Sequence, residues 1–301
     1  MGSLSDYWSF FLLAGELSFR SLLGPLLSPA LGNRLYLGIW VVAFLYACEL
    51  AFPWRKQQPK LREGVALDVF YTFANFLLFA ALIATPVFQT VQLAFHHALY
   101  ALVGLRLAPL IEFGGWPFWS RCALLFLVGD LLNYLGHRLL HRSNFLWNFH
   151  KVHHSSRQLD VLNAVRLHWA EKLFYNFFVY VPMALIGFEA QQVLLVLVVS
   201  LLLCLFTHAN LKVPLGPLKY VVNNPQLHLW HHAVEVHHQR NVNYGAALSV
   251  WDFLFRTAYL PDDRSDLELG FAGVEDFPTT LWGQQLYPLN AWMAKLRRRA
   301  P

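Results

Sequence analysis

Long apolar stretches constrain the fold of this chain more than any other feature of its sequence. Residues 35–52, 65–91 and 117–135 are apolar over most of their length. A helix needs about 20 mainly apolar residues to cross a bilayer, because lipid offers the backbone no hydrogen-bond partners. These stretches therefore predict three membrane-spanning helices. The aromatic residues Trp116 and Trp119, around the start of the third stretch, favour the membrane–water interface.

A fourth apolar region, residues 173–206, is too long for one crossing. Pro182 and Gly187 interrupt it near Ile186, which predicts a hairpin of two shorter helices that enters and leaves the membrane on one face. Hydrophobic residues make up 56% of the chain and charged residues 14%, which is too apolar for an ordinary soluble protein. We expect an all-α, integral-membrane helical bundle with about four spans and a histidine-rich cytosolic cap.

Basic residues set the expected orientation of this bundle. The loop between the first two predicted spans contains Arg55, Lys56, Lys60 and Arg62. Basic loops remain on the cytosolic side, so counting crossings from this loop places residues 137–168 and 208–238 in the cytosol. The segment 8–27 either crosses the membrane or lies in its interface, since Glu16 and Arg20 argue against simple burial.

The expected domain organisation follows from these stretches. Residues 1–116 form N-terminal transmembrane and interfacial helices, 117–260 form a histidine-rich region, and 261–301 form a more polar cytosolic tail. The final segment 292–299 ends in Lys-Leu-Arg-Arg-Arg and is expected to touch lipid headgroups. The net charge of +5 arises from basic runs beside apolar segments, which favours anionic lipids over nucleic acid as partners.

Histidines are the second strong feature, because twelve of the fourteen fall between residues 137 and 238. They form three motifs, with histidines at positions 137 and 141, at 150, 153 and 154, and at 228, 231 and 232. A four-residue step stacks two imidazoles on one helical face. In a helix His150 and His154 share a face while His153 points about 100° away, so one short element can supply two neighbouring metals.

The number of histidines narrows the choice of metal site, although imidazole alone binds iron, zinc, copper and nickel. A structural zinc site closes with four ligands, often cysteines, and the three cysteines here lie singly in apolar stretches. A haem needs one or two axial ligands. The zinc-protease motif fails because Arg138 occupies the position of its glutamate. This many neutral nitrogens therefore suits two ions of higher coordination number.

The other histidines have simpler interpretations when each is taken alone. His208 fits a hydrogen-bonded residue at a helix end, His96 and His97 fit a membrane interface, and His237 and His238 fit a solvated loop.

Polar residues near the motifs are candidates for orienting the metal ligands. Asp130 and Asn133 precede His137 by seven and four residues, so both lie near its helical face and can accept a ring N–H. A polar contact between spans is an equal alternative for both. Glu171 lies at the membrane edge, where an unpaired carboxylate is costly, and it has the same two interpretations.

From Asp130 to Tyr259 the chain resembles the fatty acid hydroxylase/sterol desaturase superfamily. Six elements carry this resemblance, in the superfamily's order. They are His137-x-x-x-His141, Phe149-His150-x-x-His153-His154-Ser155, Arg166-x-His168-x-x-Glu171, His208-Ala-Asn210, Asn224-Pro225-x-x-His228-x-x-His231-His232, and Asn243-Tyr244-Gly245 followed by Trp251-Asp252-x-x-Phe255. Trp169 and Arg256 replace a usual proline and a usual glycine, which leaves the branch of the superfamily open.

The resemblance implies a specific set of ligands for two iron ions that activate dioxygen. The nine implied ligands are His137, His141, His150, His153, His154, His208, His228, His231 and His232. His168 is implied either as a support for the ligands or as an additional one, and Asp252 joins the supporting candidates. Zinc can replace iron on purification, since it binds such ligands at least as well.

The resemblance further implies an enzyme that hydroxylates or desaturates a lipid C–H bond with dioxygen and external electrons. No segment resembles a cytochrome or a ferredoxin, so we expect a separate donor, either a b-type cytochrome or a ferredoxin with its reductase. Sterols, fatty acyl or sphingoid chains, ether lipids and carotenoids are all open as substrates. A non-catalytic metal-binding membrane protein is the main alternative, and a structural protein on a degenerate enzyme scaffold is another. We expect the protein in a bacterial inner membrane or the endoplasmic reticulum.

Overall fold

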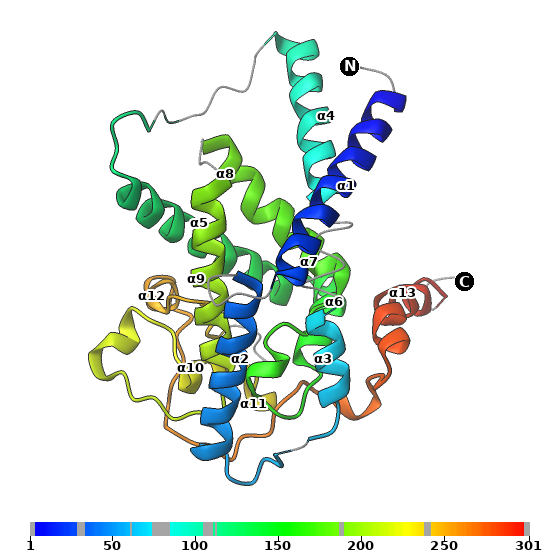
Figure 1. Ribbon diagram of the computed structural model, residues 1–301. Helices are drawn as coiled ribbons and strands as arrows, with labels where there is room; N and C mark the ends of the chain where they lie inside the picture. Colours follow the sequence, from blue (N-terminus) through cyan, green and yellow to red (C-terminus); the bar gives the residue numbers. More distant parts are fainter. Residues whose placement is uncertain are drawn as a thin grey trace.

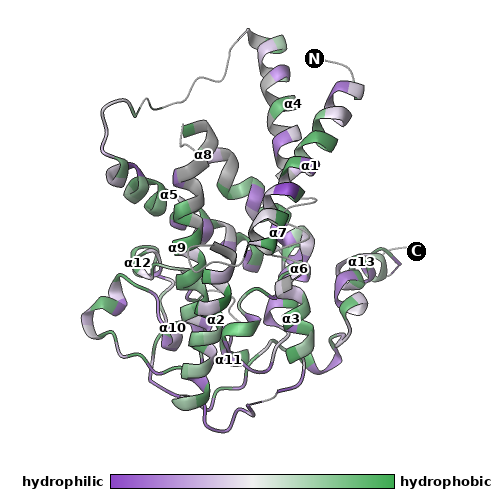
Figure 2. Ribbon diagram, viewed as in Figure 1, coloured by the Kyte–Doolittle hydropathy of each residue, from purple (hydrophilic) through white to green (hydrophobic). Residues whose placement is uncertain are grey.

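The computed structural model describes most of the chain. The described residues are 4–28, 34–60, 62–73, 85–104, 111, 113–186, 190–237 and 242–297. They are mainly helical, and in place of a sheet these ranges contain two isolated antiparallel bridges, Val222 to Leu248 and Ala233 to Leu269. The prediction of an all-α fold is confirmed. Hydrophobic colouring dominates much of the helical bundle, and hydrophilic colouring dominates many of the loops at its lower end (Figures 1 and 2).

The described residues before the histidine-rich region form four helices. They are α1 (Leu4–Leu27), α2 (Arg34–Ala51), α3 (Val65–Phe73) and α4 (Thr85–Val103). Helices α1 and α4 pack side by side at the top of the view in Figure 1. Helix α2 coincides with the first predicted span. The middle of the second predicted span, residues 74–84, lies outside the described residues, and α3 and α4 cover its two ends.

Helix α5 (Phe118–Arg142) is the described helix that is long and apolar enough to be a candidate membrane span. Two shorter apolar stretches, Tyr36–Ala51 and Val198–His208, lie in α2 and α9 (Ala190–His208). The predicted number of spans therefore stays a prediction. Helix α5 continues beyond the predicted end at residue 135, and this extension carries the first histidine motif toward the cap.

The predicted hairpin breaks where the sequence indicated. Helix α7 (Trp169–Tyr175) passes into a π-helical turn, η3 (Asn176–Tyr180), and then into α8 (Val181–Ile186). Proline lacks a backbone N–H, so Pro182 cannot continue the ordinary hydrogen-bond ladder, and a local π turn accommodates such a gap. Residues 187–189 lie outside the described part, and α9 returns along α5.

Short helices and loops form the cap. They are α6 (Asn144–His154), η2 (Val161–Asn163), η4 (Gly216–Tyr220), α10 (Pro225–His231), α11 (Val234–His237), α12 (Val250–Leu254), η5 (Val274–Asp276) and α13 (Leu281–Arg297). Side-chain caps fix where α6 and α10 start, the two cap helices that carry the second and third histidine motifs. The Ser143 hydroxyl accepts from the backbone N–H of Leu146 (3.3 Å), and the Asn224 carbonyl accepts from that of Leu227 (2.9 Å).

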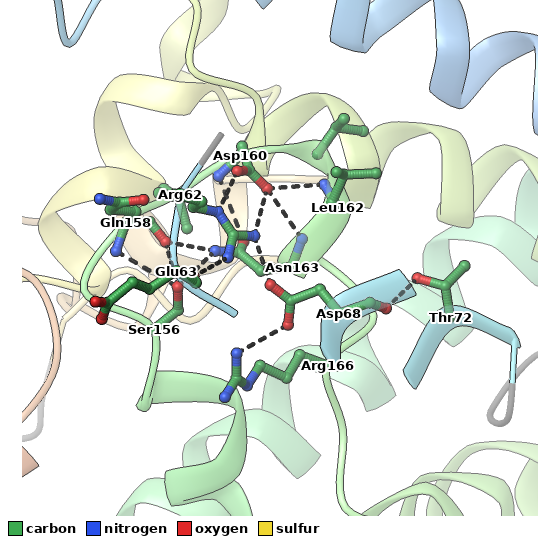
Figure 3. A network of polar contacts seen from close by, with 12 residues as sticks. Arg62, Glu63, Asp68, Thr72, Ser156, Gln158, Asp160, Leu162, Asn163 and Arg166 are labelled. Atoms are coloured by element: carbon green, nitrogen blue, oxygen red, sulfur yellow. Dashed lines mark hydrogen bonds and ion pairs between the residues drawn. The ribbon is translucent and has the colours of Figure 1, made fainter. Parts of the chain in front are cut away.

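Buried ion pairs attach the cap to the N-terminal helices (Figure 3). Arg62 binds Asp160 through its Nε (2.5 Å) and Nη2 (2.9 Å) atoms and also binds Asp68 (2.5 Å). Arg166 binds the other oxygen of Asp68 (2.9 Å). Charges this deeply buried are tolerated when each is paired. The network fixes the start of α3 against the segment between α6 and α7.

Candidate metal centre

Nine buried histidines converge from α5, α6, α9 and α10 into two adjacent groups. The five-histidine group contains His137, His141, His150, His154 and His231. The four-histidine group contains His153, His208, His228 and His232. In each group the ligand atoms lie within 4.8 Å of one another, so each group can hold one metal ion. These nine are the residues that the sequence motifs singled out.

The spacing of the motifs explains how one helix serves both groups. On α6, His150 and His154 stack on one face and enter the five-histidine group, while His153 points into the four-histidine group. Helix α10 divides its motif in the opposite sense. There His228 and the adjoining His232 enter the four-histidine group, and His231 enters the five-histidine group. Helices α6 and α10 therefore each supply histidines to both groups.

The imidazole Nε2 atoms face one another inside each group. In the five-histidine group, Nε2 of His150 lies 3.1 Å from that of His137 and 3.2 Å from that of His154. In the four-histidine group, Nε2 of His228 lies 3.0 Å from that of His208 and 3.1 Å from that of His232.

Several outward ring nitrogens are held by fixed acceptors. The Nδ1 atoms of these histidines donate to Tyr244 O from His137 (2.8 Å), to Glu171 Oε1 from His150 (2.7 Å), to Val242 O from His231 (3.0 Å), and to Cys204 O from His208 (2.8 Å). A carbonyl oxygen can only accept, so the proton of a neutral His137, His208 or His231 ring must lie on Nδ1. An ionised Glu171 fixes the proton of His150 on Nδ1 in the same way. The inward Nε2 atom then carries a lone pair.

The fit to a metal follows from these tautomers. With Glu171 ionised, the lone pairs on Nε2 of His137 and His150 point into the same space with 3.1 Å between the atoms. Two lone pairs cannot form a hydrogen bond, and they repel unless a cation lies between them. Burial also lowers the pKa of His150 to about 3 and lowers the pKa of His153 and His228 well below 6.5. The rings are therefore neutral at pH 7, as metal ligation requires.

Comparison with known proteins assigns this region. Residues 122–257 match the family model for fatty acid hydroxylase. This part of the chain belongs to the fatty acid hydroxylase family. The match lies inside the predicted histidine-rich region, residues 117–260, and it includes the nine clustered histidines.

Several curated proteins are similar to parts of the chain. Ornithine lipid hydroxylase OlsE of Rhizobium tropici is 34% identical over 158 residues, 52% of this chain and 47% of that protein. Alkylglycerol monooxygenase of Homo sapiens is 31% identical over 176 residues, 56% and 36% of the two chains. Very-long-chain aldehyde decarbonylase GL1-10 of Oryza sativa is 27% identical over 208 residues, 67% and 65%. The matches cover about half or less of the first relatives' own length. No solved structure matches the chain.

Glu171 of the fatty acid hydroxylase domain supports a histidine directly. It is buried in α7, its Oε1 atom accepts from His150, and its Oε2 atom has no hydrogen-bond partner in the described residues. Burial raises the pKa of Glu171 to about 8, so a nearby cation is needed to keep most of this group ionised at pH 7. A carboxylate behind a metal-binding histidine fixes the ring and increases its basicity. Of the two interpretations drawn from the sequence, the structure therefore favours ligand support.

Asp130 supports a loop rather than a ring. Its carboxylate accepts from the backbone N–H groups of Ala247 (3.2 Å) and Leu248 (3.1 Å) and from Trp251 Nε1 (2.9 Å). It lies two turns before His137, and this loop occupies its oxygens. The structure brings the Tyr244 carbonyl to the His137 ring, and the Asp130 carboxylate contacts the loop and not the ring. Asn133 is half-buried on α5.

Asp252 acts through the same loop. It accepts from the backbone N–H of Tyr244 (2.8 Å) and Gly245 (2.7 Å) and from the Thr257 hydroxyl (2.7 Å). Asp252 therefore holds the peptide whose carbonyl orients His137. A side chain at Gly245 would place its Cβ 2.4 Å from the Leu248 carbonyl, which explains the glycine. Burial raises the pKa of Asp252 to about 6.

His168 lies outside both groups. It caps α7, where its Nδ1 atom accepts from the backbone N–H of Ala170 (3.0 Å), and its Nε2 atom donates to the Gln285 carbonyl (3.0 Å). Both nitrogens are thus engaged, and the ring attaches α13 to the domain. Nδ1 of His97 lies 2.9 Å from the Tyr7 hydroxyl, and both residues are far from the histidine motifs in the sequence. The side chains of His96, His237 and His238 lie outside the described residues.

Proposed function

We propose that this protein is an integral-membrane lipid oxygenase with one iron ion in each histidine group. The observation that carries this proposal is the convergence of nine buried histidines into two adjacent groups, each with its ligand atoms within 4.8 Å of one another, in a fatty acid hydroxylase domain. Bound iron supplies dioxygen activation and the oxidation of an unactivated C–H bond. A metal-binding membrane protein without catalysis is the alternative that the experiment below separates.

The protein's own residues orient the histidine rings and exclude bulk water. The two groups are buried, so bulk water is kept from the reacting centre. An ionised Glu171 and the Tyr244 carbonyl hold His150 and His137 with their lone pairs inward. Such prior orientation lowers the cost of assembling the site.

The relatives' names support hydroxylation of a lipid with a polar head. One relative is an ornithine lipid hydroxylase and others are alkylglycerol monooxygenases. Both names describe oxygen insertion, one into an ornithine lipid and the other into an alkylglycerol. The proposed reaction converts R–H, O₂, two electrons and two protons to R–OH and water. The electrons come from a separate protein, a b-type cytochrome or a ferredoxin with its reductase.

We infer that α5 and the hairpin of α8 and α9 cross or enter the membrane and that the histidine cap faces the cytosol. Two contacts support the cytosolic orientation of the cap. Arg62 binds Asp160 of the cap, and Arg55 binds the Leu267 carbonyl (3.0 Å). The basic loop and the histidine cap therefore lie on the same side of the bundle. The exposed residues Lys56 and Lys60 supply the positive charge that favours the cytosolic side.

The test is lipid mass spectrometry on membranes that contain the full chain, iron and a competent reductant. The wild type should form a lipid with one additional oxygen atom, and that atom should carry the isotope supplied as ¹⁸O₂. A His153→Ala/His231→Ala variant should form none, because each group loses one ligand. His97→Ala, outside both groups, is the matched control and should retain the product. An unchanged lipid profile with iron bound would leave the non-catalytic alternative in place.

A further inference from the structure

Helix α13 carries an apolar stripe on its outer face. The stripe consists of Trp282, Leu286, Leu289, Met293 and Leu296. Alternating steps of four and three residues place these side chains on one side of a helix. Each is exposed, from 38% for Met293 to 72% for Trp282, and Trp292 beside the stripe is 51% exposed. Single exposed apolar residues are ordinary, but a continuous stripe indicates a surface that another phase or molecule covers.

The inner face of α13 is held by polar contacts, so the stripe cannot turn inward. The Tyr71 hydroxyl of α3 donates to Gln284 Oε1 (3.0 Å) and accepts from Gln285 Nε2 (2.9 Å). His168 donates to the Gln285 carbonyl (3.0 Å). On the α6 side, Lys151 donates to the Tyr287 hydroxyl (3.0 Å). These contacts fix the rotation of α13, which lies at the edge of the molecule in Figure 1.

The neighbours of α13 are also apolar and exposed. Val69 and Phe70 (53% and 45% exposed) adjoin Tyr71 on α3, at the start of the second predicted span. Trp169, 47% exposed, follows His168 directly. Tyr71 and His168 both bind α13, so these exposed apolar residues lie within two residues of the side chains that hold this helix. Helix α13 is thus attached to α3 near the start of the second predicted span.

The basic residues and tryptophans of α13 indicate what covers the apolar stripe. Helix α13 contains no acidic residue, and its last turn carries Lys295 and Arg297, followed in the sequence by Arg298 and Arg299. Basic residues beside an apolar stripe complement anionic headgroups above acyl chains. Tryptophan is enriched at this boundary.

We propose that α13 lies in the plane of the bilayer, with its stripe in the acyl region and its basic end among anionic headgroups. It then clamps the histidine cap onto the membrane through α3, α6 and α7. Helix α6 supplies His150, His153 and His154, so the clamp sets the height of both histidine groups above the lipid surface.

The test measures depth by electron paramagnetic resonance on the full chain in nanodiscs. The three native cysteines are replaced by alanine, and a nitroxide is attached at Leu289→Cys on the stripe or at Ala294→Cys. Ala294 is exposed and lies on another side of the helix, so it is the matched control. The nanodiscs contain phosphatidylcholine, alone or mixed with phosphatidylglycerol. Collisions with dissolved oxygen report the acyl region, and collisions with a water-soluble nickel chelate report the aqueous phase.

The Leu289→Cys label should collide mainly with oxygen, at a depth of about 5–10 Å below the headgroups. The Ala294→Cys label should collide mainly with the nickel chelate. Lys295→Gln/Arg297→Gln should make the stripe label shallower in phosphatidylglycerol nanodiscs and leave it unchanged in phosphatidylcholine alone. Equal nickel collisions for both labels would overturn the proposal. A stripe label shielded from both reagents would also overturn it, by indicating a protein partner, and dipolar broadening between labels would indicate a second copy. None of these readouts depends on metal or turnover, so their failure is separate from a failure of the proposed function.

Discussion

The two histidine groups contain similar ligands but are oriented by different means. In the five-histidine group, three outward nitrogens donate to acceptors, on Tyr244, Glu171 and Val242. In the four-histidine group His208 donates to Cys204 O, whereas Nδ1 of His153 and of His228 has no hydrogen-bond partner among the described residues. In the described contacts, more outward hydrogen bonds therefore orient the rings of the first group than those of the second.

This difference predicts unequal metal sites. Rings that are already oriented lose less conformational freedom when a metal binds. A carboxylate partner also makes the imidazole a stronger electron-pair donor to the metal. We expect the five-histidine group to hold its iron more tightly and the four-histidine group to lose its iron first. Different affinities and coordination numbers also give the two ions distinct surroundings, which suits a reaction in which they play different parts.

The largest expected effect tests whether the two groups are separate sites. His228→Ala and His231→Ala remove neighbouring ligands of α10 that point into different groups. Each variant should lose one of the two irons and retain the other, because the second group keeps all its ligands. Product formation should fall about 100-fold or more in both, since a lost ligand costs more than a lost supporting contact. Iron analysis of the purified variants and lipid mass spectrometry measure these losses. Loss of both irons from either variant would show one coupled site.

A smaller effect tests the carboxylate that belongs to one group alone. Glu171→Gln keeps an acceptor for His150 but removes the negative charge behind it. The iron affinity of the five-histidine group should fall about 10- to 100-fold, and that of the four-histidine group should not change. Chelator competition should then lose the difference between a slow and a fast phase of iron release. The exposed Glu275→Gln is the matched control and should keep both phases. A faster loss from the four-histidine group would contradict the assignment of Glu171.

Much of the two histidine groups could be predicted from the sequence, because the patterns that define them are local. Helical spacing is enough to assign His150 and His153 to different directions, and the helix-breaking residues near Ile186 mark the end of α8. The carbonyl acceptors were missed because every residue has a carbonyl, so side-chain identity carries no signal for them. The Asn243-Tyr244-Gly245 motif was the available sign of that loop.

Other features could not be predicted because they depend on tertiary contacts. Asp130 lies near the face of His137 in helical projection, but the chain folds a distant loop onto its oxygens. In the sequence, Arg55 and Arg62 indicated only a basic cytosolic loop, whereas in the structure both are buried against the cap. Helix α13 begins at Leu281 and continues through Pro288, whereas the sequence indicated a segment starting near residue 292. Its inner polar contacts come from α3, α6 and α7, which no local pattern reveals.

The smallest expected effect tests whether a loop, rather than a ligand, distinguishes the two groups. Asp252→Asn leaves one oxygen where the carboxylate accepted from Tyr244, Gly245 and Thr257, so at least one donor loses its partner. A buried donor left unpaired costs about 1–3 kcal/mol, and part of this cost should reach His137 through the Tyr244 carbonyl. Iron release from the five-histidine group should become roughly three- to tenfold faster, a weaker effect than direct loss of a supporting carboxylate. Thr257→Val is the matched control, because it removes one donor to Asp252 and leaves both backbone contacts. If Thr257→Val accelerates iron release as much as Asp252→Asn, the hydroxyl rather than the Tyr244 peptide transmits the effect, and the loop no longer explains why the five-histidine group is the better oriented.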